Sequence, residues 1–110
     1  MDYQNLKTKY TIEKLKLKYE VKLMKHGFYF VGTTNYNPRY VFLEYKNMKG
    51  PEKLLNSIIR IWKDLQTGKT EAEFILDVSM AQEYRDWKHL SIKELFALIE
   101  EIENTGKIPL

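Results

Sequence analysis

Two aromatic and β-branched runs, residues 28–31 and 40–43, form the clearest hydrophobic pattern in the chain. A polar loop that contains Pro38 separates them. Runs of this composition around such a loop predict the two strands of a β-hairpin. Both faces of each predicted strand carry bulky side chains, so both faces need cover. The other segments supply helices for one side of the sheet and no evident cover for the second side.

Residues 14–24 alternate between polar and apolar side chains, which predicts a half-buried strand. A turn at His26 and Gly27 would join this strand to the hairpin. The alternative is a helix that Gly27 ends, because Lys, Leu and Glu favour helices. On a helix, two apolar sets would lie nearly opposite each other and leave no single stripe to bury, so we expect the strand. One set is Leu15, Tyr19 and Leu23, and the other is Leu17, Val21 and Met24.

The second half of the chain predicts helices and one further strand. Pro51 precedes apolar residues at helical spacing, which predicts a helix over residues 52–66 that Gly68 would end. Residues 73–78 alternate and predict a short strand. Ser79 and Ser91 each precede Gln or Glu by three positions, the spacing of a capping box, which predicts helices to about residue 90 and over 92–104. Gly106 would end the last helix.

Together these elements predict an α+β fold. We expect a three- to four-stranded antiparallel sheet, connected as a meander, with two or three helices packed on one face. The sequence also allows a short additional helix within residues 2–12. The length of 110 residues corresponds to one globular domain over residues 1–110. We expect Trp62 and Phe96 to be buried between the helices at 52–66 and 92–104.

Composition excludes several classes of function. The chain has no cysteine, which excludes disulfides, thiolate catalysis and Cys-based zinc sites. No apolar run approaches the ~20 residues that span a bilayer, and the first ten residues lack the hydrophobic segment of a signal peptide. We therefore expect a cytoplasmic protein with no membrane partner.

Candidate catalytic residues are few and scattered. His26 and His89 are the only histidines and lie far apart in the sequence, one in a predicted turn and one at a predicted helix end. Glu100, Glu101 and Glu103 cluster at a helix C-terminus, where they oppose the helix dipole and call for a compensating lysine. No glycine-rich loop that could cradle a phosphate is present. We expect no enzymatic activity, no metal, no cofactor and no small-molecule substrate.

Charge is distributed unevenly along the chain. Residues 1–50 hold ten Lys and Arg against four Asp and Glu, whereas residues 51–110 hold eight against eleven. Codon bias of an AT-rich genome is one explanation for the abundance of lysine. The other is a basic face that attracts phosphate groups or an acidic protein.

The predicted strand faces combine this charge with the aromatic runs. If the odd positions of residues 14–24 face the helices, the lysines at even positions point to the open side of the sheet. The parity of the second and third strands places aromatic rings on that side. The predicted partner-binding residues are Lys16, Lys18, Lys22, Tyr29, Tyr40 and Phe42. A register slip of one residue would reverse the second strand, and the alternative is that the N-terminal segment covers these rings.

This surface suggests two functions. The first is a non-enzymatic protein-binding module, acting as a regulator, inhibitor or adaptor, because aromatic rings rimmed by charge are typical of interfaces. Its small size suits the accessory proteins that phages and mobile elements encode. The alternative is single-stranded nucleic-acid binding, with bases stacked on the rings and phosphates held by lysines. The chain has three arginines against fifteen lysines, which favours the protein partner.

Overall fold

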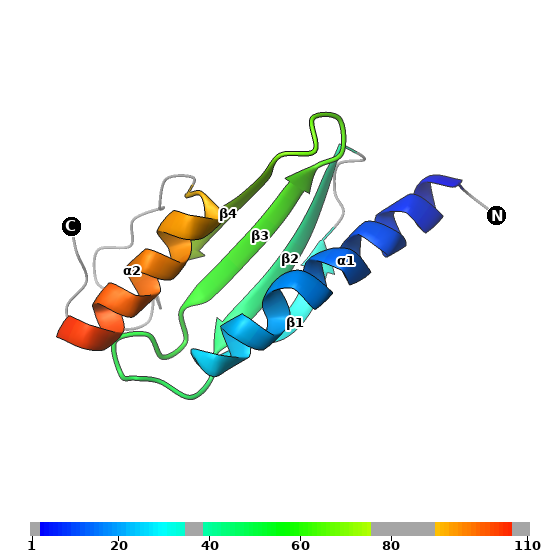
Figure 1. Cartoon of the computed structure of the whole chain (residues 1–110). Coiled ribbons are helices and arrows are strands. Elements are labelled where there is room, and N and C mark those ends of the chain that lie inside the picture. Colours follow the sequence, from blue (N-terminus) through cyan, green and yellow to red (C-terminus); the bar gives the residue numbers. More distant parts are fainter. Residues whose placement is uncertain (1–2, 35–38, 76–89, 107–110) are drawn as a thin grey trace.

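The fold is α+β, with a four-stranded antiparallel sheet and two helices. The computed structural model describes residues 3–34, 39–75 and 90–106 (Figure 1). The elements are α1 (Tyr3–Lys25), β1 (Phe28–Thr34), β2 (Tyr40–Asn47), β3 (Ile58–Asp64), β4 (Thr70–Ile75) and α2 (Ile92–Thr105). The strands pair in the order β1-β2-β3-β4, each antiparallel to the next. The predicted α+β class and the meander connection are confirmed, although some of the strands lie at other residues than predicted.

One hydrophobic core joins the sheet to both helices. Along β2, every second residue is buried, and the register places Leu43 beside Ile61 and Ile61 beside Ala72. Helix α1 packs against β1 and β2, and α2 packs against β4 (Figure 1). The helices contribute Leu15, Tyr19, Leu23, Leu95, Phe96, Ile99 and Ile102 to this core. The side chains at the alternate strand positions therefore form a second face, which we call the outer sheet face.

The predicted strand over residues 14–24 is wrong, because these residues belong to α1. Leu15, Tyr19 and Leu23 recur every four residues and are all buried against the sheet, so one apolar set suffices to dock the helix. The helix ends where Gly27 adopts a φ of +85°. An added Cβ there would lie only 3.2 Å from the Gly50 carbonyl oxygen, so glycine is required for both conformation and space. Gly27 is thus the stop of a helix and not a hairpin turn.

The predicted helix over residues 52–66 is also wrong. Residues after Pro51 form a turn, in which the Leu54 N–H donates to the Pro51 carbonyl, and β3 then begins at Ile58. The Asn47 side chain fixes this turn, since it donates to the His26 carbonyl at 3.0 Å and accepts from the Gly50 N–H at 2.7 Å. The apolar residues from Ile58 onward form a strand because they pair with β2 and β4 on either side.

The predictions for the C-terminal part have a mixed outcome. Strand β4 begins three residues before the predicted strand at 73–78, whose last three residues, like the predicted helix from residue 80 to 89, lie outside the described residues. The predicted final helix is confirmed as α2, with a capping box between Ser91 and Glu94 and a C-cap at Gly106. Trp62 and Phe96 are both buried, but on opposite faces of the sheet, so the prediction that they meet is wrong. No helix in the described residues is long and apolar enough to cross a membrane.

Candidate functional site

The outer sheet face carries a row of three aromatic rings across β2 and β3. Tyr40 and Phe42 are two residues apart on β2, and Phe42 pairs with Trp62 on β3. The ring centroids lie 6.1 Å apart for Tyr40 and Phe42 and 6.0 Å apart for Phe42 and Trp62, with tilted planes. Such spacings fall in the range of favourable aromatic pairs. The rings are therefore held against each other as one apolar strip.

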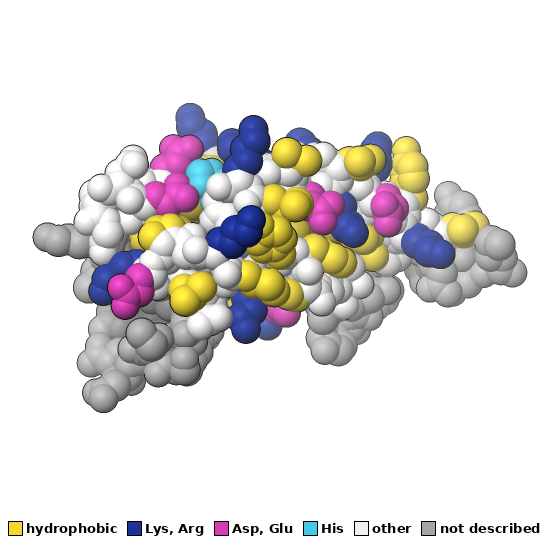
Figure 2. Space-filling view, turned by 90° about the horizontal axis from the view of Figure 1, so that it is seen from below, with side chains coloured by type: hydrophobic (Ala, Val, Ile, Leu, Met, Phe, Trp, Pro, Cys, Tyr) yellow, Lys and Arg dark blue, Asp and Glu magenta, His cyan; other side chains and the backbone are white. Residues whose placement is uncertain are grey.

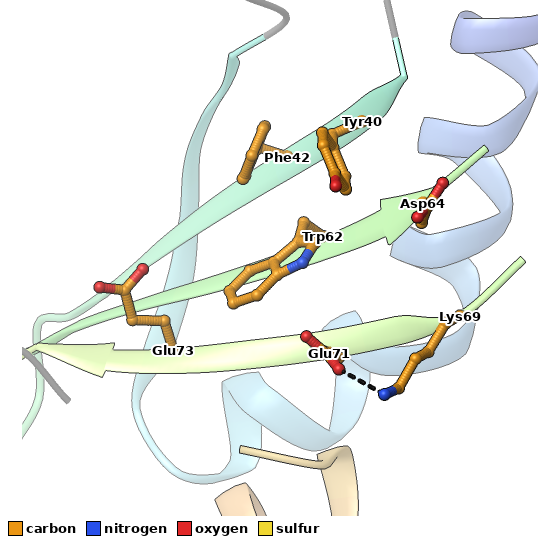
Figure 3. Close-up of a pocket in the computed structure, with 7 residues that line it drawn as sticks. All are labelled: Tyr40, Phe42, Trp62, Asp64, Lys69, Glu71 and Glu73. Atoms are coloured by element: carbon orange, nitrogen blue, oxygen red, sulfur yellow. Dashed lines mark ion pairs between the residues drawn. The ribbon is translucent and has the colours of Figure 1, made fainter. Parts of the chain in front are cut away.

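A pocket of about 320 Å³ lies over this strip. Trp62 is only 8% exposed, whereas Tyr40 and Phe42 are half-buried. Figure 3 shows the lining side chains projecting from one side of β2, β3 and β4. The lining residues are Tyr40, Phe42, Trp62, Asp64, Lys69, Glu71 and Glu73, and we call this site the aromatic pocket.

Asp64 forms a rigid, ionised end of the aromatic pocket. The Arg39 guanidinium donates to both of its carboxylate oxygens, at 2.8 Å from Nη2 and 3.1 Å from Nε. The backbone N–H of Gln66 donates to the same carboxylate at 2.9 Å. These donors, Arg39 first, hold the pKa of Asp64 well below its usual range despite the opposing effect of burial. Asp64 is thus a fixed negative charge.

The β4 side of the aromatic pocket carries two more carboxylates. Glu71 pairs with Lys69 at 2.8 Å, and this contact raises the pKa of Lys69 (Figure 3). Glu73 lies two residues further along the strand, and among the described residues no ion pair holds it. The register places Arg60, which pairs with Glu44, opposite Glu73, and the pocket combines aromatic rings with the Glu73 carboxylate.

The six predicted partner-binding residues do not form one surface. Tyr40 and Phe42 line the aromatic pocket. Tyr29 is on the outer sheet face as predicted, but it pairs with Lys46 near the far end of the sheet and does not line the pocket. Lys49 Nζ lies 5.3 Å from the centroid of its ring.

Lys16, Lys18 and Lys22 lie on α1, which packs on the other side of the sheet. The Nζ atom of Lys16 is 4.2 Å from the centroid of the Phe30 ring, and that of Lys22 is 4.1 Å from the centroid of the Phe96 ring. Lys18 Nζ is 5.4 Å from the centroid of the neighbouring tyrosine ring on α1. These are cation–π contacts within the fold. The predicted juxtaposition of lysines with the outer rings is wrong, because it depended on a strand over residues 14–24.

The residues of β3 and β4 that complete the aromatic pocket were not predicted as binding residues. Trp62 and Asp64 were assigned to a helix, although they are two residues apart in a β-branched run, as strand neighbours on one face would be. Glu71 and Glu73 flank Ala72 with the same period of two. This alternation was the signal that could have located them.

The histidine and the acidic cluster meet at the ends of the two helices. His26 Nδ1 lies 2.9 Å from both carboxylate oxygens of Glu103. The partner of Glu103 in the structure is thus His26 and not the expected lysine, while Glu100 and Glu101 are exposed. Within the described ranges, no group of three or more potential metal ligands occurs. His89 lies outside those ranges.

Comparisons with protein-family models, with curated proteins and with solved structures found no match. Arguments about function therefore rest on the geometry of the chain itself. The aromatic pocket is the strongest candidate for a binding site, because it combines a concave shape, an aromatic surface and defined charges.

Proposed function

We propose that this protein is a non-enzymatic protein-binding module whose aromatic pocket receives a basic side chain of its partner. The observation that carries this proposal is the row of Tyr40, Phe42 and Trp62 beside the carboxylate of Glu73. As a regulator, inhibitor or adaptor in the cytoplasm, the protein would act by occupying a surface of its partner.

The chemistry of the aromatic pocket suits a Lys or Arg side chain. A cation over an aromatic face gains roughly 0.5–1 kcal/mol when exposed and about 2 kcal/mol when desolvated, and Trp is the best acceptor. The aliphatic stem of the same side chain would cover the apolar strip. Glu73 would neutralise the cation, while Asp64 and Glu71 already have cationic partners.

The size of the pocket is compatible with one side chain of a partner as the ligand. Ligand pockets for drug-sized molecules range from about 300 to 1,000 Å³, and this pocket is at the lower end of that range. Aromatic anchors at the centre of a contact surface are typical hot spots of protein interfaces. The pocket would therefore be the centre of a larger docking surface on the outer sheet face.

Single-stranded nucleic acid is the less well supported alternative. Base stacking on aromatic rings needs neighbouring cations to hold the phosphates. Here Glu73 lies beside the rings and would repel phosphate, whereas the cations Arg39 and Lys69 are already paired with Asp64 and Glu71. Helix α1 carries seven Lys and two Glu, but it packs on the opposite side of the sheet. The lysine-rich helix and the aromatic rings therefore lie on different faces of the molecule.

Titration of the full chain with short peptides tests this proposal. The probes are a lysine- and arginine-containing peptide, its glutamate-containing counterpart and a fluorescent single-stranded oligonucleotide. We expect the basic peptide to shift the NMR signal of the Trp62 indole N–H and the amide signals of β2, β3 and β4. We expect Phe42→Ala and Glu73→Gln to weaken this binding.

Two matched variants serve as controls for this titration. Tyr29→Ala removes a ring from the outer sheet face at a distance from the pocket, and Glu100→Gln removes an exposed carboxylate from α2. Both should bind the basic peptide like the wild type. The proposal is wrong if no peptide perturbs the pocket, or if the oligonucleotide binds there with a log–log salt slope of about 0.7 per phosphate contact.

A further inference from the structure

Helix α1 has a second apolar stripe that faces away from the sheet. Leu17 is 82% exposed, Val21 66% and Tyr10 64%. Large apolar side chains with such exposure on one helix are unusual in a monomer when they are contiguous. The members of this α1 stripe are Leu6, Tyr10, Leu17, Val21 and Met24.

Helical geometry places these residues on one side. At 3.6 residues per turn, the five members fall within an arc of about 60°, on the side of the helix away from Leu15 and Tyr19. Leu15 and Tyr19 are buried against the sheet, so the α1 stripe points to the exterior. The space-filling view from the side of α1 and β1 shows hydrophobic side chains at the surface among Lys, Arg, Asp and Glu side chains (Figure 2).

The two borders of the α1 stripe carry opposite charges. Tyr10, Leu17 and Met24 recur every seven residues, and taking them as heptad position d puts Val21 at position a. The g positions are then Glu13 and Glu20, and the e positions that follow each of them by five residues are Lys18 and Lys25. One border of the α1 stripe is therefore acidic and the other basic.

We propose that the α1 stripe binds the α1 stripe of a second copy of this chain, with the two helices parallel. In a parallel pair, the g residues of one helix face the e residues of its partner, so Glu13 and Glu20 would each meet a lysine. An antiparallel symmetric pair would instead place like borders together, Glu beside Glu and Lys beside Lys. The charges on the two borders therefore favour the parallel orientation.

Lys14 interrupts the apolar contact of this pair. It occupies the a position between Tyr10 and Leu17, and its Nζ atom lies 5.1 Å from the centroid of the Tyr10 ring. In a parallel pair the a positions of the two helices face each other, so Lys14 would lie beside its own copy, which reduces the stability of the contact. Lys7 occupies the preceding a position. The apolar contact is thus concentrated around Leu17, Val21 and Met24.

The charge pattern favours a second copy over a lipid surface. A helix that lies on an anionic membrane is rich in Lys or Arg on its polar face, and α1 carries seven Lys. Here Glu13 and Glu20 lie directly beside the α1 stripe, where they would repel anionic headgroups. In the parallel pair, the same two residues contribute attraction.

Sedimentation velocity of the full chain over a series of concentrations tests self-association. One helix pair is a small interface, so the series should extend to high micromolar concentration. We expect a reversible dimer, and we expect Leu17→Glu to raise its dissociation constant by about tenfold or more. Met48→Glu is the matched control, because Met48 is also exposed but lies outside α1. A wild-type chain that stays monomeric throughout the series overturns the proposal.

A charge exchange tests the predicted contact between the borders. Glu20→Lys should weaken the dimer, since it places like charges together, and adding Lys25→Glu should restore it. Restoration by the double variant supports the pairing of these two borders. Equal weakening by the single and the double variant would overturn it, provided that circular dichroism shows both variants to be folded.

Disulfide crosslinking tests the orientation of the two helices, and the chain has no native cysteine that could form a competing disulfide. Tyr10→Cys and Met24→Cys lie about 21 Å apart along the helix, well beyond the ~7 Å that a disulfide tolerates between Cα atoms. In a parallel dimer, each single variant crosslinks to itself. If neither does and only the mixture of the two variants crosslinks, the helices are antiparallel and the proposed orientation is wrong.

Flotation with vesicles of anionic and of neutral lipid tests whether the α1 stripe binds a membrane instead. Co-flotation of the wild type that is lost in Leu17→Glu, without dimerisation in solution, would assign the α1 stripe to a membrane and overturn the proposal. The aromatic pocket lies on the other side of the sheet. Failure of this proposal is therefore separate from failure of the proposed function, which peptide titration measures.

Discussion

Replacing Tyr45 by Phe is expected to stabilise the protein, against the usual direction of core substitutions. Tyr45 is on β2, points into the core and is 0% exposed. No described residue provides a hydrogen-bond partner for its buried hydroxyl. Its ring packs edge-on against Phe30 with centroids 5.5 Å apart, a contact that a phenylalanine would retain.

The size of the effect follows from the cost of burying an unpaired polar group. Leaving one buried donor or acceptor without a partner costs about 1–3 kcal/mol. Tyr45→Phe removes the hydroxyl, keeps the ring and leaves little new void. We therefore expect the free energy of unfolding to rise by about 1–3 kcal/mol, which for a domain of this size raises the Tm by about 4 °C per kcal/mol.

The same substitution has a signature at alkaline pH. Burial, followed by the negative charge of Glu20, raises the pKa of Tyr45 above its ordinary value of 10.0. A group whose pKa is higher in the folded state binds more protons in that state above its unfolded pKa, so wild-type stability falls as the pH rises beyond 10. Tyr45→Phe lacks this contribution, and its advantage over the wild type should grow in that range.

Urea denaturation followed by circular dichroism, at neutral pH and above pH 10, measures both effects. Tyr19→Phe is the matched control, because Tyr19 is a core tyrosine on α1 whose hydroxyl is not among the buried polar groups that lack a hydrogen-bond partner. It should change stability little or lower it. A loss of stability in Tyr45→Phe at neutral pH would refute the reasoning, because it would show that the hydroxyl has a partner in solution.

Three further substitutions test the core, a helix cap and a turn. Ile59→Ala truncates a fully buried β3 side chain and should lower the unfolding free energy by roughly 2–5 kcal/mol in urea titrations; a small change would place Ile59 outside the core. Ser91→Ala removes the α2 cap and should cost about 1 kcal/mol in the same assay, unless α2 is capped in another way. Asp64→Asn removes a carboxylate whose pKa is lowered by Arg39. This carboxylate stabilises the wild type above pH 3.8, and its contribution is lost as the pH falls. The variant should therefore be less stable than the wild type above pH 3.8, and the difference should shrink in acid. Urea midpoints across the acidic range check this, and parallel curves for both proteins would contradict it.

The sequence predicted the elements whose signals are local. The hairpin of β1 and β2 follows from two runs rich in β-formers, and α2 follows from its capping box and its C-terminal glycine. The local signal of strand β3 is ambiguous, because Ile58, Ile59, Ile61 and Trp62 satisfy both a helical and a buried-strand pattern. Its state is decided by pairing with β2 on one side and β4 on the other. Local periodicity cannot show such pairing.

The candidate site was predicted only where strand parity was correct. Tyr40 and Phe42 were assigned to the outer sheet face from the even positions of β2, and both line the aromatic pocket. Trp62 was missed because its strand was taken for a helix. The error thus propagated from one element to the site, and with it the acidic character that Glu71 and Glu73 give to the pocket remained hidden.

Helix α1 shows how an error in prediction can locate a surface. The helix was rejected because Leu15 and Leu17 begin two apolar sets on opposite sides, and a monomer has only one core to cover them. The structure keeps the helix, buries the set of Leu15 and leaves the set of Leu17 exposed. The premise that every apolar stripe is covered within one chain was therefore the false step. If the premise holds for the assembled protein, the exposed set requires a partner outside the chain, and the opposite charges of Glu20 and Lys25 beside it are those with which a second copy would complete the pair.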